Sequence, residues 1–352
     1  MPLLIATDTW HPEVNGVVRA VEQTVQQLRQ TGRRVEMITP GLFRTLRCPT
    51  YPELRLAVAT SSAFARRLEP LRRDVTHVHI ATEGPIGWLT RQWCRRWGLA
   101  FTSSFHTRFP DYVAMRAGVG RDLVWRGLTG FHNLAQQTMV ATRRLGVELR
   151  ARGIRRVHHC PLGVDTSLFT PDGPTHPLLA ELPGPVRLYV GRVAVEKNLT
   201  ALLESRMPGS LVIVGEGPDR ATLEARYPHA RFLGGRFGAE LAALYRSADV
   251  FVFPSRSETL GLVMLEALAS GTPVAAYPVP GPLDVLGERA TGLAGGMEPI
   301  GALHGDLDRA TRAALRVDRA ACVREARRSS WARCTEAFVR GLVPAARGRR
   351  VA

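Results

Sequence analysis

Short apolar runs alternate with stretches of helical spacing along most of the chain. In the first half, runs of strand type occupy residues 3–7, 35–40, 75–82, 99–106 and 138–142. A polar turn and an amphipathic segment, from about residue 17 to residue 28, follow the first of these runs. Strands that alternate with helices build parallel sheets covered on both faces. The pattern therefore predicts an α/β protein with doubly wound sheets.

The stretch 250–277 shows this alternation most clearly. The apolar run VFVFP leads into the polar loop SRSET, and Gly261 precedes a helical stretch, LVMLEALAS, and a second strand-like run, VAAY. Strand–helix–strand units bind ligands where strand ends meet helix N-termini. This unit carries Glu258 in its loop and Glu266 inside an otherwise apolar helix. Because carboxylates are rarely buried without a partner, Glu266 either points to solvent or faces a ligand crevice.

Two further positions in the first half, Gly16 and His106, are candidates for a ligand-binding or catalytic site. Gly16 stands where the first strand's loop enters its helix, so it allows either a close approach to a phosphate or simply a tight turn. His106 ends a predicted strand, where α/β enzymes place functional groups, although a lone histidine is often only a structural hydrogen-bonding residue.

The composition describes a globular chain long enough for two cores, with 45% apolar and 22% charged residues among 352. No run of about 18 apolar residues occurs, and no basic segment precedes the first apolar run, so neither a spanning helix nor a secretory signal is expected. The five cysteines form no C-x-x-C pair, which indicates free thiols in a reducing cytoplasm and no zinc site.

The net charge of +16 is unevenly distributed. Residues 1–160 carry +13, residues 161–315 carry −4, and residues 316–352 carry +7. This asymmetry suggests an anionic partner for one half. Lys197 is the only lysine among 47 basic residues, which hints that an ammonium group is wanted there. Proline and glycine cluster at 161–174, where the charge also changes, and this predicts a domain boundary.

Two short segments resemble known metal-binding or nucleotide-binding motifs but do not meet their requirements. Asp306 and Asp308 spell D-x-D, but they precede a helical stretch, so helix capping is the expected role. LVIVGEGPDR lacks the third glycine of a dinucleotide fingerprint, and no Walker loop or G-x-S-x-G occurs.

Several phrases in order carry a family resemblance. The sequence resembles the retaining GT-B glycosyltransferases of family 4 in four places. These are the acids Glu258 and Glu266 followed by ASGTPV, the phrase TDTWHPEVNGV, the phrase SFHTRF, and the G-R-x5-K spacing of GRVAVEK. Together with PVPGPLDVL, they are most similar to the GDP-mannose-dependent α-mannosyltransferases of that family.

The resemblance implies two Rossmann-like doubly wound domains that face a central cleft. Residues 1–163 would bind the acceptor, and a C-terminal helix at about 328–352 would cross back to complete that domain. Residues 164–327 would bind the donor. The reaction implied is retaining transfer of a hexose, with mannose from GDP-mannose favoured, to a hydroxyl of a lipid-linked or anionic glycoconjugate. Neither a cofactor nor a metal is expected.

The family's roles fall on named positions of this chain. Arg192 and Lys197 would stabilise the leaving diphosphate, which the helix N-terminus also receives. Glu258 would contact the sugar hydroxyls, Glu266 the ribose hydroxyls, and His106 would lie beside the sugar. The catalytic set implied is His106, Arg192, Lys197 and Glu258; the donor-binding set is Gly16, Arg192, Lys197, Gly215, Leu233, Glu258, Gly261, Leu262, Val263 and Glu266; the acceptor-binding set is Asn15, Arg108, Asp111 and Tyr112.

Three alternatives remain open. A UDP-sugar-dependent transferase of glucosyl or sulfoquinovosyl type would share these motifs, and so would an inactive relative. The arginine excess would also permit a nucleic-acid-binding protein, but that class leaves the acidic middle and the ordered motifs unexplained, so no nucleic acid is expected as a partner.

Two arginine-rich segments suggest contact with an anionic membrane at its cytoplasmic face. In residues 61–74, Phe64, Leu68 and Leu71 form an apolar stripe flanked by arginines. Residues 88–99 interleave tryptophans with arginines, although those tryptophans would equally pack on the sheet. The membrane-contact set is Phe64, Arg66, Arg67, Arg72 and Arg73.

Overall fold

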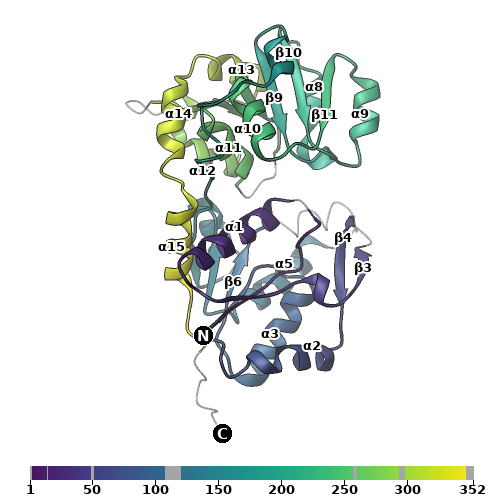
Figure 1. Cartoon of the computed structure of the whole chain (residues 1–352), viewed down its shortest axis with the longest axis vertical. Coiled ribbons are helices and arrows are strands. Elements are labelled where there is room, and N and C mark those ends of the chain that lie inside the picture. The colour runs from purple at the N-terminus through teal and green to yellow at the C-terminus, as the bar shows by residue number, and fades with distance from the viewer. Residues whose placement is uncertain are drawn as a thin grey trace. The chain divides into compact units, whose positions relative to one another are not determined.

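The computed structural model describes residues 2–13, 15–48, 51–107, 120–256, 260–292 and 298–345, with the backbone alone for residues 51–54 (Figure 1). Its contacts divide the chain into two compact units. The first comprises Met1–Leu162 with Trp331–Ala352, and the second comprises Gly163–Ser330.

The described part of the first unit is built on a parallel six-stranded sheet in the order β2-β1-β5-β6-β7-β8. Its strands are β1 (Leu3–Ala6), β2 (Val35–Ile38), β5 (His77–Ile80), β6 (Thr102–Phe105), β7 (Gln137–Val140) and β8 (Val157–His159). The strand order reverses between β1 and β5, which is the position where open α/β sheets bind ligands.

The helices of the first unit are α1 (Gly16–Gln30), α2 (Ser61–Leu68), α3 (Pro85–Trp97), α5 (Arg121–His132), α6 (Arg143–Ala151) and α15 (Trp331–Gly341), with short 3-10 turns η1 (Pro40–Leu42) and η2 (Glu69–Leu71). An antiparallel hairpin of β3 (Arg44–Cys48) and β4 (Tyr51–Val58) lies outside the sheet.

Alternation along β1 sorts the first unit's core into two layers. Leu4 packs with Phe64 of α2 on one face of the sheet. Ile5 packs with Val21 of α1 and Phe338 of α15 on the other face. The C-terminal helix α15 therefore belongs to the first unit, where it runs beside α1 (Figure 1).

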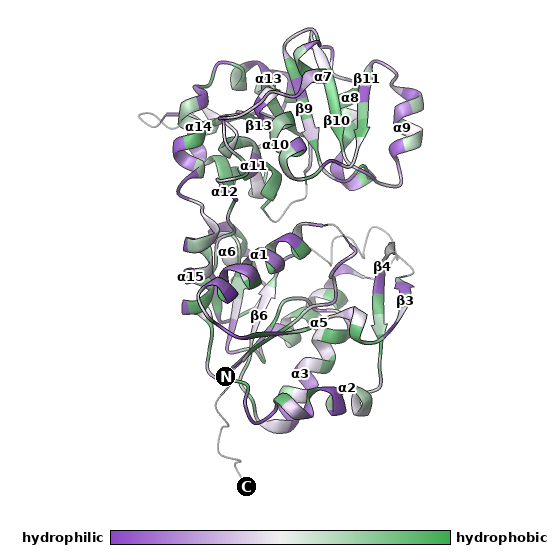
Figure 2. Cartoon of the chain, in the orientation of Figure 1, coloured by the Kyte–Doolittle hydropathy of each residue, from purple (hydrophilic) through white to green (hydrophobic). Residues whose placement is uncertain are grey.

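The second unit has its own parallel six-stranded sheet, in the order β11-β10-β9-β12-β13-β14. Its strands are β9 (Val186–Val190), β10 (Ser210–Val214), β11 (Ala230–Gly234), β12 (Val250–Phe253), β13 (Val274–Ala276) and β14 (Gly301–Leu303). The order reverses between β9 and β12, as in a Rossmann fold. The central strands of this sheet are strongly apolar (Figure 2).

The helices of the second unit are α7 (Pro177–Ala180), α8 (Leu199–Leu203), α9 (Arg220–Arg226), α10 (Gly238–Ser247), α11 (Leu262–Ala269), α12 (Pro280–Leu286), α13 (Leu307–Ala314) and α14 (Arg319–Ala326), with 3-10 turns η3 (Val195–Lys197) and η4 (Glu288–Thr291). The expected doubly wound architecture is thus confirmed in both units.

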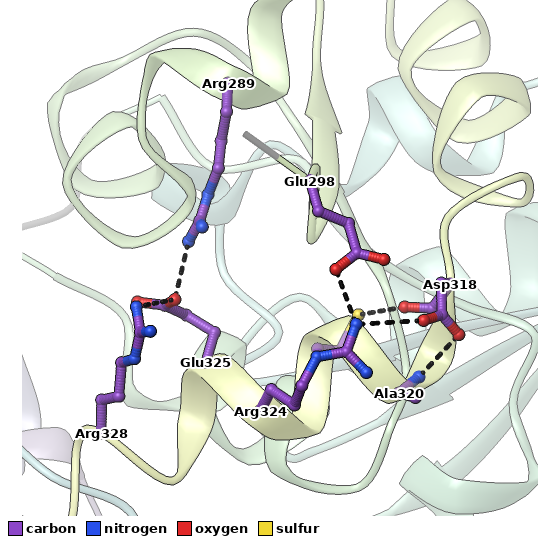
Figure 3. Close-up of polar contacts among 8 residues, drawn as sticks. Arg289, Glu298, Asp318, Ala320, Arg324, Glu325 and Arg328 are labelled. Carbon is purple, nitrogen blue, oxygen red and sulfur yellow. Dashed lines mark hydrogen bonds and ion pairs between the residues drawn. The ribbon is translucent and has the colours of Figure 1, made fainter. Parts of the chain in front are cut away.

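Ion pairs on α14 hold the segment that precedes β14 (Figure 3). Arg324 Nη2 lies 2.6 Å from Glu298 Oε2 and 3.3 Å from Asp318 Oδ2. Glu325 Oε2 lies 3.3 Å from Arg289 Nη2, on η4. Exposed pairs of this kind each contribute little to stability, so their role is to fasten a long connection to the helix.

Asp306 caps α13 rather than forming half of a metal motif. Its Oδ1 accepts hydrogen bonds from the backbone N–H groups of Asp308 (2.9 Å) and Arg309 (3.1 Å). Asp308 Oδ1 in turn accepts a hydrogen bond from Ser205 Oγ at 2.6 Å. The capping role expected from the sequence is confirmed.

The expected contact of Phe64 with a membrane is wrong. Phe64 is 1% exposed and stacks on Phe43, and Leu68 is fully buried, because the apolar stripe of α2 packs into the first unit's own core. Arg72 is also engaged within the unit, with its guanidinium 4.0 Å from the centre of the Trp97 ring. Within the described ranges, no helix is both long and apolar enough to cross a membrane.

His79 is a buried histidine in the middle of the first unit. Its Nδ1 lies 2.9 Å from Thr102 Oγ1 and its Nε2 lies 3.0 Å from Ser104 Oγ. Because Thr102 Oγ1 also donates to a backbone carbonyl, a neutral ring with the proton on Nδ1 satisfies both contacts. Burial lowers the pKa of His79 from its ordinary 6.5 to about 3.

This pKa predicts a loss of stability in mild acid. Below the ordinary pKa the unfolded chain binds a proton that the folded chain rejects, so the free energy of unfolding falls by about 2 kcal/mol between about pH 7 and pH 5 through this residue. We expect His79→Gln to show a flatter dependence of unfolding free energy on pH over that range, measured by urea unfolding. Equal slopes in the two proteins would contradict this assignment.

Candidate functional site

Three successive loops of the second unit meet backbone to backbone at the carboxyl edge of its sheet. Gly191 N donates to Val214 O at 2.9 Å, and Gly215 N donates to Gly234 O at 2.8 Å. A Cβ on Gly215 would lie 1.8 Å from Gly191 O, and Gly215 has a φ of 144° that favours glycine. These contacts fix the paths of the chain after β9, β10 and β11.

Arg192 and Lys197 lie on the connection between β9 and α8. The Tyr189 hydroxyl donates to Arg192 O at 2.8 Å, which holds the start of this connection. Arg192 Nη1 lies 3.7 Å from Glu196 Oε1. Lys197 ends η3, and Asn198 follows in the left-handed conformation with a φ of 54°.

Asn198 fastens this turn to the end of the neighbouring strand. Its Nδ2 donates to Pro254 O, directly after β12, at 3.1 Å. Because β9 and β12 are the strands at which the order reverses, the turn that carries Lys197 is held at the position where this fold binds ligands. The loop that starts at Pro254 leads into α11.

α11 is buried except at its N-terminal end. It begins after Gly261, whose φ is 87°, and Leu262 and Val263 of its first turn are half-buried, whereas every later residue is buried. Gly261 has no side chain with which to cap the helix. The accessible end of α11 is therefore its N-terminus, which carries partial positive charge.

Glu266 lies inside α11 and does not point to solvent. It is 5% exposed, and its Oε2 accepts a hydrogen bond from the Tyr245 hydroxyl at 3.0 Å. Tyr245 comes from α10, and its ring packs edge-on against Phe169 and Phe251. The solvent-facing alternative for Glu266 is thereby excluded, and the carboxylate is held in a fixed direction.

The remaining donor positions border these loops. Leu233 is half-buried at the end of β11, and beyond it Gly235 N donates to Glu216 Oε1 at 3.2 Å. Ser255 is buried after β12, and its hydroxyl has no partner among the described residues. The Arg256 guanidinium lies 4.0 Å from the centre of the Tyr277 ring.

In the first unit, Asn15 and Gly16 form the start of α1. Asn15 Oδ1 accepts hydrogen bonds from Val17 N (2.9 Å) and Val18 N (3.0 Å), so this side chain caps the helix. An added Cβ on Gly16 would meet nothing within 4 Å. Space therefore lies beside Gly16, and crowding by the protein is not what requires a glycine there.

His106 follows β6 and lies beside a small cavity of about 30 Å³ in the first unit. Burial lowers the pKa of His106, and the Glu83 carboxylate opposes this shift. His79 and Ser104 line the same cavity, together with Cys160. Four predicted site residues, Arg108, Asp111, Tyr112 and Glu258, lie outside the described residues.

Sequence reasoning missed Asp8, which lies after β1 at the N-terminus of α3. Its Oδ1 accepts from Ile86 N at 2.6 Å, and its Oδ2 accepts from Thr82 Oγ1 at 2.7 Å and Gly87 N at 3.2 Å. Burial raises the pKa of Asp8 to about 6, although these hydrogen bonds lower it. The only signal was an acid directly after a strand. Tyr245 and Glu83 gave no signal, because their partners are distant in sequence.

The packing of the glycine loops generates a stability prediction. We expect Gly215→Ala to lower the free energy of unfolding of the second unit by at least about 2 kcal/mol, because the loops after β9 and β10 must separate. Gly305→Ala is the matched control, since an added Cβ there would meet nothing within 4 Å. Urea unfolding that finds both variants equally stable would contradict this packing.

Comparison with known proteins assigns the family. Residues 14–168 match the model described as Glycosyltransferase Family 4, and residues 184–297 match that of Glycosyl transferases group 1. The chain is 33% identical, over 98% of its length and 97% of the relative, to a GDP-mannose-dependent alpha-mannosyltransferase of Mycobacterium tuberculosis. It is 29% identical, over 80% of its length and 60% of the relative, to sulfoquinovosyl transferase SQD2 of Arabidopsis thaliana.

Solved structures agree on the fold. Sucrose-phosphate synthase from Thermosynechococcus elongatus superposes with a TM-score of 0.74 at 21% identity, covering 96% of this chain and 97% of that one. Trehalose-6-phosphate synthase OtsA superposes with a TM-score of 0.69, at 13% identity, covering 98% and 100%. The chain therefore belongs to glycosyltransferase family 4, whose members are retaining GT-B enzymes that transfer a sugar from a nucleotide sugar.

Proposed function

We propose that this enzyme transfers mannose from GDP-mannose, with retention, to a hydroxyl of a lipid-linked or anionic glycoconjugate. Relatives named GDP-mannose-dependent alpha-mannosyltransferase support the donor: the Mycobacterium tuberculosis protein and one from Mycolicibacterium smegmatis, 32% identical over 83% of this chain and 84% of its own length. The relative named sulfoquinovosyl transferase SQD2 supports the alternative of a transferase of sulfoquinovosyl type.

The observation that carries the proposal is the hydrogen bond from Asn198 to Pro254. It holds the turn bearing Lys197 against the loop that leads to the open N-terminus of α11. As the glycosyl bond breaks, the diphosphate gains negative charge, and Arg192, Lys197 and the helix N-terminus stabilise that charge in place. The acceptor hydroxyl then attacks the face from which the diphosphate departs.

The other donor contacts follow from the same arrangement. Glu266, oriented by Tyr245, binds the ribose hydroxyls, since a buried carboxylate fixed by a phenol is a pre-organised acceptor. Glu258 binds the sugar hydroxyls. Leu233 and the backbone beyond Gly215 border the base. By the family resemblance, His106 lies beside the sugar, and Asn15, Arg108, Asp111 and Tyr112 contribute to the acceptor site.

A metal is not needed in this proposal. Two cationic side chains and a helix N-terminus supply the positive charge that Mg²⁺ or Mn²⁺ would otherwise bring to a diphosphate. The backbone that carries Arg192 and Lys197 is held by hydrogen bonds from Tyr189 and Asn198 before the substrate arrives, so their charge costs little reorganisation during the reaction.

The donor is tested by incubating the purified enzyme separately with GDP-mannose, UDP-glucose and UDP-sulfoquinovose and measuring release of the nucleoside diphosphate. Each reaction is run with excess EDTA and with added Mn²⁺. We expect GDP release from GDP-mannose at similar rates in both conditions. Release of UDP alone would overturn the donor, and activity abolished by EDTA and restored by Mn²⁺ would overturn the metal-free mechanism.

The two cations give a mutational prediction. We expect Arg192→Ala and Lys197→Ala each to lower turnover by about a hundredfold or more, because each removes one pre-organised charge from the leaving group. Arg312→Ala, an exposed arginine of α13, is the control and should turn over as wild type does. Near-normal turnover of Lys197→Ala would refute the site.

We also propose that the enzyme binds an anionic membrane surface at its cytoplasmic face through the first unit. With Phe64 buried, α2 offers only charge, from exposed Arg66 and Arg67, and exposed Arg73 follows η2. Exposed apolar side chains come instead from the β3–β4 hairpin, where Leu46 is 66% exposed and Val58 is 53% exposed. At about 1 kcal/mol for each basic residue near anionic lipid, such a surface supports reversible binding.

Vesicle sedimentation tests this surface. We expect binding to vesicles that contain phosphatidylglycerol, weaker binding as salt rises, and a loss of at least about tenfold in affinity when Arg66, Arg67 and Arg73 become Gln. The matched control replaces Arg309, Arg312 and Arg316 of the second unit with Gln, which removes the same charge. Equal binding to neutral vesicles, or equal loss in both triple variants, would leave a soluble acceptor as the better proposal.

A further inference from the structure

A chain of buried polar side chains runs through the first unit and ends beside His106. His132 Nε2 lies 3.0 Å from Glu83 Oε1, and His132 Nδ1 lies 2.9 Å from Ser103 Oγ. Ser103 Oγ lies 3.2 Å from Thr138 Oγ1. The side chain of His132 is fully buried and that of Glu83 is 9% exposed. These groups come from α5, β6, β7 and the loop after β5.

A neutral imidazole of His132 satisfies every contact in this series of buried polar side chains. The carboxylate can only accept, so His132 Nε2–H donates to Glu83, and His132 Nδ1 accepts from the Ser103 hydroxyl. The Ser103 oxygen then accepts from the Thr138 hydroxyl. This arrangement fixes the Glu83 carboxylate against the ring of His132.

Glu83 and His106 follow neighbouring strands of the first unit's sheet. β5 and β6 are adjacent and parallel, with Ile80 opposite Ser103. Glu83 follows β5 and His106 follows β6, so both residues lie at the carboxyl edge of the sheet. The charge of Glu83 raises the pKa of His106, against the larger lowering by burial.

A second titratable group that acts on His106 carries no charge near neutral pH. His79, on β5, interacts with His106, but burial holds the pKa of His79 at about 3. Of these two groups, Glu83 is the one that raises the pKa of His106.

We propose that Glu83 is a positioning residue for His106, and that His132 and Ser103 hold Glu83 for this purpose. The carboxylate keeps the imidazole oriented beside the sugar and sets the pH at which that imidazole gains a proton. The inference rests on the proposed role of His106. It adds that the charge of Glu83 controls the protonation of His106, which neither the family assignment nor the choice of donor implies.

The test is the titration of His106 by NMR without substrate, with its resonance assigned by comparison with His106→Gln. We expect Glu83→Gln, which keeps the shape and removes the charge, to move the pKa of His106 downward. Glu83→Asp, which keeps the charge on a shorter side chain, should give a value between those of wild type and Glu83→Gln. Glu69→Gln is the matched control, because Glu69 pairs with Arg72 on η2, and it should leave the titration unchanged.

The pH profile of kcat/KM gives a second readout. The limb that reports His106 should move to lower pH in Glu83→Gln, with kcat/KM reduced by about tenfold to a hundredfold and largely recovered in Glu83→Asp. A folded Glu83→Gln protein with the wild-type titration of His106 would overturn the proposal. If Glu83→Gln does not fold, a wild-type titration in Glu83→Asp overturns it instead. Failure of the donor assignment would leave the titration result intact, because no donor is present.

Discussion

Backbone packing at the carboxyl edge of the second sheet is the constraint on which the proposed donor site depends. The loops after β9 and β10 approach so closely that the space at Gly215 admits no Cβ. Their paths are thereby fixed, and the connection that follows β9 must carry Arg192 and Lys197 toward the end of β12. Charge stabilisation of a leaving group needs this rigidity, because groups that must move to meet the charge lose much of their effect.

The two units cover the buried faces of their parallel sheets with different kinds of side chain. The second unit fills its central strands mainly with apolar side chains, although β9 carries the buried Arg187, and it places the buried Glu266 against Tyr245. The first unit instead places buried histidines and hydroxyls on β5, β6 and β7, where His79 and His132 each contact two polar groups. Buried polar groups of this kind are tolerated because each has its partners. The lowered pKa of His79 makes the first unit sensitive to acid.

Local patterns in the sequence predicted most of the fold and the positions of the loops that we propose bind the donor. Alternation of apolar runs predicted two doubly wound units, and the spacing of Arg192, Lys197 and Glu266 placed them on the loops and helix that the structure shows. The amphipathic stripe of α2 led to a wrong prediction of membrane contact. The same periodicity is found in helices that pack on a core and in helices that lie on a membrane. The Tyr245–Glu266 and Glu83–His132 contacts join residues 21 and 49 positions apart, and no local pattern predicts such pairs.

The central claim is that the loops at the β9–β12 reversal bind the nucleotide of the donor. Hydrogen–deuterium exchange with and without GDP measures this directly, peptide by peptide. The account predicts slower exchange on GDP addition in residues 191–198 and 260–269, with little change in the first unit's arginine-bearing helices α2 and α3. Unchanged exchange in both of those segments at saturating GDP, or protection confined to α2 and α3, would contradict it.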